Sequence, residues 1–231
     1  MKNSSRTHKV LPVFVGGTGR SGTTVMGDLL GSHEHIRTSV PIEIKFLANK
    51  SGLLHLVFGR ESADQKEKFS PLSITGQIRR RRREKQAFIK IEKEFLDRIW
   101  NDWWDIDAPP PHGRGLHSGI SKQRLQELLD RLVKDLRINR VWAGRRFMRD
   151  FISSQEDHGN QKYWVETTPL NIAQARRIRK LFPHALFINM VRDPRDVIAS
   201  LLTKNWGPTT PFEGLEWIDK RLIDGHNALR V

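Results

Sequence analysis

Residues 17–24, with the sequence GTGRSGTT, have the composition of a loop that binds a phosphate. A Walker A loop has two glycines separated by four residues, then a lysine and a hydroxyl residue. Gly17 and Gly22 have that spacing, but Thr23 stands in the lysine position. The cation lies three residues earlier, as Arg20, so the main side-chain charge for the β- and γ-phosphates of ATP is missing. We expect the backbone amides of the loop and the next helix to hold one phosphate beside Arg20. The alternative is a glycine-rich turn that only joins a strand to a helix.

A second basic segment, residues 188–200 (INMVRDPRDVIAS), continues from an apolar stretch that predicts a buried strand. Arg192 falls at the carboxyl end of that strand, where open α/β sheets bind ligands. Ser200 follows eight residues later, about two turns into the next helix. Such a pair can converge on one phosphate. The alternative is structural, with Arg192 and Arg195 only forming ion pairs with the aspartates of the segment.

Together the two segments resemble the donor-binding motifs of sulfotransferases that use 3′-phosphoadenosine-5′-phosphosulfate (PAPS). The resemblance is nearer to the carbohydrate and tyrosylprotein branches of that family than to the cytosolic small-molecule branch. It implies transfer of the sulfuryl group from PAPS to an acceptor hydroxyl by in-line displacement, which leaves 3′-phosphoadenosine-5′-phosphate (PAP). It also implies that Arg20 stabilises charge on the bridging oxygen and that Arg192 and Ser200 contact the 3′-phosphate. The amides that would bind the 5′-phosphate belong to Arg20, Ser21, Gly22, Thr23 and Thr24.

A base that takes the acceptor proton adds about 100- to 10,000-fold to the rate of such a transfer. Glu43 is the candidate, because the related carbohydrate and tyrosylprotein enzymes carry a glutamate soon after the first helix. A structural ion pair is the alternative role for Glu43. His33 and His35 are the rival bases, although His33, at the end of the first helix, has the character of a structural residue. We find no carboxylate pair that suggests a metal site and expect none.

The residues 166–168 (Glu-Thr-Thr) stand at the end of another predicted strand and face the same crevice. Related enzymes carry a lysine near this place, and Thr167 occupies its position here. That departure leaves Arg20 as the only obvious cation at the transferred group. These residues therefore either contact the donor or acceptor, or cap the next helix.

The elements that must position these residues follow from the apolar pattern. Apolar runs predict buried strands over 10–15, 162–165 and 185–191. Helices are expected after each of them, over 23–30, 169–181 and 194–202, the last two with a proline at the first position. This order predicts an α/β fold, a three-layer sandwich with a central parallel sheet and a P-loop-like loop. Ser121 is the expected N-cap of another helix, whose leucines between 125 and 136 recur at helical spacing and form core.

We expect one sulfotransferase domain over 1–231, with 61–115 as a variable helical insertion. A helix is predicted there from Gln86 to Trp104, ended by a turn at 109–113. Its clustered tryptophans (Trp100, Trp103 and Trp104) either line an acceptor pocket or pack in the core. The further basic loop that many sulfotransferases carry after the 3′-phosphate helix is not found, so either the donor site is completed differently or the chain is truncated at its carboxyl end.

The chain has a formal net charge of +14, which favours an anionic partner. Much of the excess lies in Arg79–Arg83, followed by Lys85, which forms either a solvated helix face or an anion-binding patch. The absence of cysteine excludes disulfides and thiolate metal sites, and no apolar run is long enough for an integral membrane segment. We expect a soluble, cytoplasmic protein.

Two other functions remain open: a nucleotide kinase or ATPase with a degenerate loop, and a non-catalytic polyanion-binding protein. Nucleic acid is not expected, because its binding motifs are missing. The acceptor is open among carbohydrate, peptide tyrosine and lipid.

Overall fold

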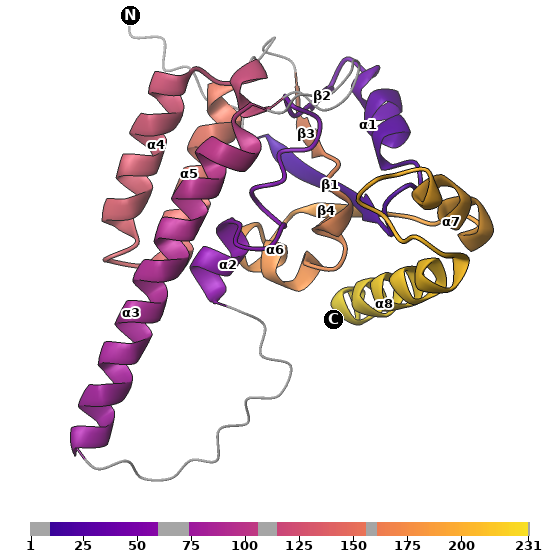
Figure 1. The fold of residues 1–231 in the computed structure, drawn as a ribbon. Coiled ribbons are helices and arrows are strands. Elements are labelled where there is room, and N and C mark those ends of the chain that lie inside the picture. The colour runs from indigo at the N-terminus through magenta and orange to yellow at the C-terminus, as the bar shows by residue number, and fades with distance from the viewer. Residues whose placement is uncertain (1–9, 60–73, 106–114, 156–160, 231) are drawn as a thin grey trace, which may run out of the picture.

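A computed structural model of the chain describes residues 10–59, 74–105, 115–155 and 161–230. Within them, four parallel strands form one sheet in the order β2-β3-β1-β4 (Figure 1). The strands are β1 (Leu11–Gly17), β2 (Ile36–Thr38), β3 (Tyr163–Glu166) and β4 (Leu186–Met190). In the register, Val13 of β1 is paired with Val165 of β3 and with Leu186 of β4. The parallel sheet confirms the predicted fold class, and β2 is an addition to the three predicted strands.

The two faces of the sheet carry separate apolar cores, because successive side chains of a strand point to opposite faces. Phe14 and Trp164 belong to the larger core. Val15 and Val165 pack on the other face, together with Met26 of the first helix. Figure 1 shows that helix, α1, on one side of the sheet and α2 and α6 on the other. The bounds of the covering helices are α1 (Thr23–Gly31), α2 (Leu53–Phe58), α5 (Arg140–Ser154) and α6 (Ala175–Leu181). The three layers are those that the sequence predicts.

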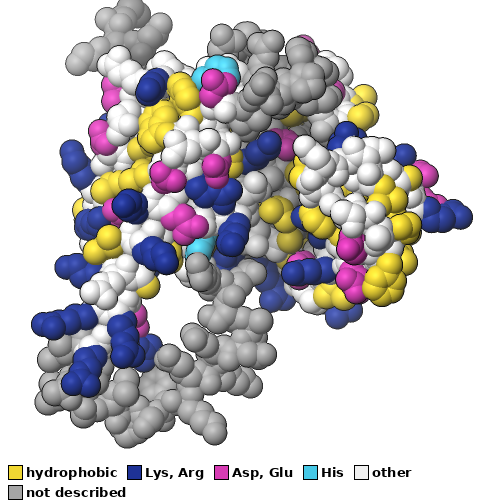
Figure 2. Space-filling model, viewed as in Figure 1, with side chains coloured by type: hydrophobic (Ala, Val, Ile, Leu, Met, Phe, Trp, Pro, Cys, Tyr) yellow, Lys and Arg dark blue, Asp and Glu magenta, His cyan; other side chains and the backbone are white. Residues whose placement is uncertain are grey.

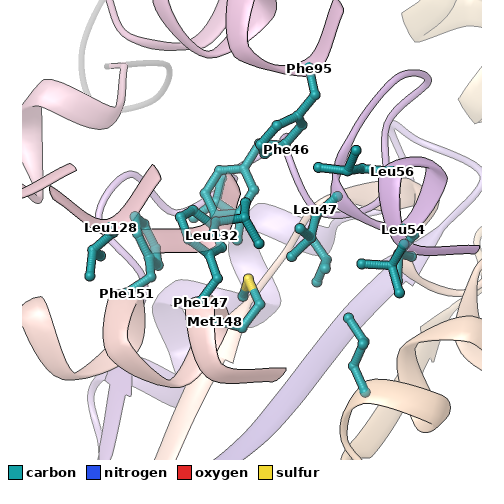
Figure 3. Close-up of a cluster of buried hydrophobic side chains, with 14 of the residues drawn as sticks. Phe46, Leu47, Leu54, Leu56, Phe95, Leu128, Leu132, Phe147, Met148 and Phe151 are labelled. Atoms are coloured by element: carbon teal, nitrogen blue, oxygen red, sulfur yellow. The ribbon is translucent and has the colours of Figure 1, made fainter. Parts of the chain in front are cut away.

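The larger core fills the space between the sheet and a group of long helices (Figure 3). Phe46, from the segment between β2 and α2, inserts its ring against Phe151 of α5, with 5.0 Å between centroids. Leu128 and Leu132 of α4 (Lys122–Asp135) are almost fully buried, which confirms the predicted leucine stripe. Ser121 caps α4 as expected, since its hydroxyl accepts a hydrogen bond from the Arg124 amide.

The basic segment is helical, and its helical run ends at Trp103, close to the predicted end at Trp104, but the prediction for the start is wrong. α3 spans Ile74–Arg98, so it begins well before Gln86, and a π-helical turn at Ile99–Trp103 follows it. Phe88 is the first buried side chain of α3 among those described. The residues from Arg79 to Gln86 are charged or polar and exposed, and for that reason they carry no apolar periodicity to detect. The turn predicted at 109–113 lies outside the described residues.

The final third of the chain also differs in detail from the prediction. The helix expected over 169–181 is a 3₁₀ turn, η3 (Pro169–Asn171), followed by α6. α7 (Pro194–Leu202) begins as predicted, at a proline that follows an aspartate cap. α8 (Pro211–Leu229) is an unpredicted helix, although it starts with a capping box between Thr210 and Glu213. Among the described helices, none combines the length and the apolar character that a membrane span requires.

Candidate functional site

The loop after β1 has the backbone of an anion-binding site. Gly19, Arg20 and Gly22 have positive φ angles of 83°, 56° and 96°. Left-handed residues in such a loop turn successive amides into a concave surface that accepts anions. α1 then begins at Thr23, and within the described residues no side chain caps its first amides and no acidic residue stands in its first turn. These N–H groups and the helix dipole are therefore available to a negative group.

Two glycines let the entrance of this loop pass between neighbouring strand ends. A Cβ atom on Gly16 would lie 2.8 Å from the Pro169 carbonyl oxygen and from the Ile172 amide nitrogen. A Cβ on Gly17 would lie 2.5 Å from the Met190 carbonyl oxygen. Both separations are shorter than real Cβ contacts, so glycine is required at each position. The loop is thus packed tightly between the segments that follow β3 and β4.

The hydroxyl side chains of the loop face the protein more than the solvent. Ser21 and Thr23 are buried, and Thr24 is half-buried. The Ser21 hydroxyl has no hydrogen-bond partner within the described parts of the chain. Thr23, in the position of the Walker lysine, is 4% exposed and presents no cation to a nucleotide. The charge that the loop offers is therefore that of Arg20 and of the backbone amides.

The second basic segment forms the start of α7, next to this loop. The Asp193 carboxylate caps α7 by accepting a hydrogen bond from the Arg195 amide, and it forms a 2.6 Å ion pair with the Arg195 guanidinium. These bonds lower the pKa of Asp193 to about 2. Arg192 lies 3.3 Å from Asp196. Both predicted ion pairs, Arg192 with Asp196 and Arg195 with Asp193, are therefore present.

Arg192 and Ser200 also reach the phosphate loop. Arg20 Nε donates a 2.9 Å hydrogen bond to Ser200 Oγ, across 180 residues of sequence. Arg192 Nη1 donates to the Arg20 carbonyl oxygen at 3.5 Å. All three side chains are exposed or nearly so. The structure thus brings together the loop arginine after β1, Arg192 just after the adjacent strand β4, and Ser200 in the helix that follows β4.

Glu43 lies in an irregular segment that is attached to the end of β3. On one side of it, the Ile42 carbonyl oxygen accepts hydrogen bonds from the Thr167 amide (3.1 Å) and hydroxyl (3.0 Å). On the other side, the Ile44 amide donates to the Glu166 carboxylate at 3.0 Å. Glu43 is half-buried between these two attachments. Since β3 is the parallel neighbour of β1, the segment and the phosphate loop both lie at the carboxyl ends of the strands.

The two rival histidines lie at the opposite end of α1 from that loop. The His35 amide donates to His33 Nδ1 at 3.1 Å, and their rings are 5.5 Å apart. The nine residues of α1 separate them from the loop by about 13 Å along the helix axis. Their contacts are those of a local turn after the helix, which favours the structural role.

Glu166 is the unexpected part of the site. It is fully buried, and its carboxylate accepts hydrogen bonds from the Ile44 amide, the Thr168 amide and hydroxyl, and Asn171 Nδ2. Burial raises the pKa of Glu166 to about 7, against the lowering effect of these bonds. Thr168 therefore bonds to Glu166 rather than capping the turn that begins at Pro169. The sequence signal was its position at a strand end, which gave no hint of the burial.

The clustered tryptophans belong to the core. Trp103 is 3% exposed and packs against Phe95, with 6.5 Å between ring centroids. Trp100 and Trp104 are partly buried against the same core and lie 5.1 Å apart. A hollow of about 680 Å³ lies elsewhere, between β4 and α8, and none of the predicted site residues lines it. The candidate site therefore lies at the carboxyl ends of the strands and not in this hollow.

The chain combines a parallel α/β sheet, a glycine-rich loop at the end of β1 and a second arginine segment beside it, and the loop has threonine where a Walker ATPase has lysine. Residues 12–224 match the Sulfotransferase family, and the chain belongs to that family. It is thus a member of a family of transferases that move a sulfuryl group. A comparison with curated proteins finds no match.

Proposed function

We propose that the protein is a PAPS-dependent sulfotransferase. The observation that carries the proposal is the hydrogen bond from Arg20 to Ser200, which joins the two segments that would bind the phosphates of one nucleotide. In this assignment the amides of residues 20–24 hold the 5′-phosphate. Arg192 and Ser200 hold the 3′-phosphate, and PAPS differs from ADP and ATP in carrying that group. The Arg20–Ser200 bond would give way to bonds with the donor.

The chemistry needs positioning and charge more than covalent catalysis. The acceptor oxygen forms a bond to sulfur while the bond from sulfur to the 5′-phosphate oxygen breaks, which leaves PAP and a sulfate ester. The Arg20 guanidinium stabilises the charge that develops on the departing phosphate oxygen. Glu43 takes the proton of the acceptor hydroxyl. The acceptor is a carbohydrate, a peptide tyrosine or a lipid, and turnover of labelled PAPS with each class would identify it.

Calorimetry with PAP, ADP and ATP tests the donor assignment. PAP should bind, and ADP, which lacks the 3′-phosphate, should bind much more weakly. Arg192→Ala should weaken PAP binding by about 10-fold, the lower end for a bond to a charged group, because Arg192 is half-exposed. Arg149→Ala is the control, since it removes an equally charged, exposed side chain of α5 that pairs with Asp150. Equal affinity for PAP and ADP would overturn the assignment.

Turnover tests the base. Glu43→Gln keeps the size of the side chain but cannot accept a proton, so we expect activity to fall about 100-fold or more while PAP affinity stays the same. A Glu43→Gln enzyme that turns over at the normal rate would remove Glu43 from the mechanism and leave the donor assignment intact.

The kinase alternative is disfavoured by the buried Thr23 side chain. The polyanion alternative has one observation in its favour. Arg79–Arg83 are exposed on the projecting part of α3, where Figure 2 shows Lys and Arg side chains gathered. Only Arg80 among them has an ion pair recorded in the described residues, at 2.8 Å to Glu84. Five successive residues of a helix point in all directions around it, so this surface offers positive charge to an anionic polymer without competing with the donor site.

A further inference from the structure

Glu166 joins the segment around Ile44 to the turn that follows β3, across 122 residues of sequence. Its Oε1 atom accepts hydrogen bonds from the Ile44 amide and the Thr168 amide, both at 3.0 Å, and from the Thr168 hydroxyl. Its Oε2 atom accepts from Asn171 Nδ2. The side chain is fully buried, so it contacts neither donor nor acceptor. A carboxylate in this place can act only through the groups that it holds.

One of those groups leads to the phosphate loop. Asn171 Nδ2, besides its bond to Glu166, donates to the Val15 carbonyl oxygen at 3.1 Å. Val15 stands in β1 just before the glycines that open the loop. The same turn that carries Asn171 makes the close approach to Gly16. Glu166 is therefore connected to β1, just before the phosphate loop, through the buried side-chain amide of Asn171.

The other side leads to Glu43. The segment 42–45 has no regular secondary structure, and Lys45 has a positive φ of 57°. The Ile42 carbonyl oxygen accepts from the Thr167 amide just after β3, and within the described residues no later backbone–backbone hydrogen bond ties the segment to β3 or to that residue. After Glu43, the Ile44 amide bonds to Glu166 and the Lys45 amide bonds to Thr168 Oγ1 at 3.3 Å, while the Lys45 carbonyl oxygen accepts from the Asn49 amide at 3.1 Å. Thr168 Oγ1 in turn donates to Glu166.

We propose that Glu166 is a positioning residue, which fixes the segment 42–45 against the end of β3 and so holds Glu43 in register with the phosphate loop. The role of Glu43 that this serves rests on the proposed function. A carboxylate suits the task better than an amide, because four donors converge on it and it can accept from all of them. A glutamine would turn an NH₂ group toward one of these donors. Misplacement of a catalytic group by about 1 Å costs on the order of 100-fold in rate.

Three variants test the proposal. Glu166→Gln keeps the volume and removes the charge that the carboxylate carries at pH 8, the pH of all these measurements. Thr168→Val removes the hydroxyl that links Glu166 to the Lys45 amide, and Thr168→Ser restores it. In each protein, hydrogen exchange at the Ile44 and Lys45 amides, PAP affinity and turnover would be measured, with and without Glu43→Gln in the same chain.

We expect Glu166→Gln and Thr168→Val to speed exchange at these two amides at least 10-fold and to lower turnover about 10- to 100-fold, with PAP affinity within about threefold of normal. Thr168→Ser should recover both. In the Glu43→Gln background, Glu166→Gln should cause no further loss, because there is no base left to position. Unchanged exchange at Ile44 and Lys45 would overturn the proposal. So would equal losses of turnover in the two backgrounds, which indicate a general folding defect. If the normal protein failed to bind PAP, the proposed function would fail, and the exchange rates would still decide the anchoring role.

Discussion

The raised pKa of Glu166 predicts an unusual dependence of stability on pH. The pKa of this carboxyl is 4.5 when unperturbed and about 7 in the folded protein, because burial disfavours the charged form. Between these values the folded chain binds a proton that the unfolded chain does not. The free energy of unfolding must therefore decrease as the pH rises through this window, and level off above about pH 7. Most carboxylates, whose pKa falls on folding, give the opposite slope.

The size of the effect follows from the same two values. At about 1.4 kcal/mol per pKa unit, the rise from 4.5 to about 7 corresponds to about 3 kcal/mol of stability lost between pH 4.5 and pH 8. For a chain of this length, 1 kcal/mol moves the Tm by about 2–4 °C. Glu166→Gln removes the titration. The stability of the normal protein relative to that variant should thus fall by about 3 kcal/mol, or about 6–12 °C, over the window.

Urea unfolding of both proteins at pH 5, 6, 7 and 8 measures this difference, and the subtraction cancels every other titrating group. Glu216→Gln is a matched control, because it makes the same replacement at an exposed side chain of α8. A relative stability that is flat with pH, or that rises with it, would refute the reasoning: Glu166 would then be ionised throughout the window, with its donors outweighing the cost of burial.

Three further predictions test the surroundings of the site. Gly16→Ala places a Cβ in a space that the η3 backbone occupies and should cost about 1–3 kcal/mol, seen as a lower Tm. Thr210→Ala breaks the capping box of α8 and should cost about 1 kcal/mol in urea unfolding, with PAP affinity unchanged. Replacing Arg81–Arg83 by alanine should lower the salt concentration at which the protein elutes from a heparin column and leave PAP affinity intact; elution at the normal salt concentration would remove α3 as a polyanion-binding surface.

The fold was predictable where burial imposes a pattern on the sequence. β1 and the leucine face of α4 carry dense apolar runs, because neighbouring elements cover them. β2 is only three residues long and contains Arg37, so its sequence carries no apolar run that predicts a strand. The Arg37 guanidinium donates to the carbonyl oxygens of Ile152 in α5 and of Gln155, the C-cap of α5. The exposed part of α3 is missed for the opposite reason: within the described residues, none of its side chains from Arg79 to Ala87 is buried. The break between η3 and α6 depends on Asn171, whose side chain bonds to Glu166 and Val15 from the turn before α6.

The candidate site divides in the same way. The loop at 17–24 and the Arg192 segment are local patterns, and their spacing identifies them without a structure. The contact between Arg20 and Ser200 is not local, because it requires β4 to lie beside β1. Glu166 was noticed only for its place at a strand end. Three of its four donors belong to Thr168 and Asn171, close by in the sequence, but the fourth, the Ile44 amide, is brought to it only by folding.

If the proposed roles are correct, the strand order indicates the side from which the acceptor approaches. β4, β1 and β3 are consecutive in the sheet, and each ends in one part of the site. β4 leads to Arg192, for the 3′-phosphate, β1 leads to the loop for the 5′-phosphate, and β3 supports Glu43. In the proposed function, a donor with its 3′-phosphate over β4 and its 5′-phosphosulfate over β1 would direct the sulfuryl group toward β3. The acceptor hydroxyl then arrives from the side of β3, where Glu43 is held, opposite to the departing phosphate, which is the arrangement that an in-line displacement requires. The acceptor-binding surface is therefore to be sought around the segment 39–45 rather than at the hollow beside α8.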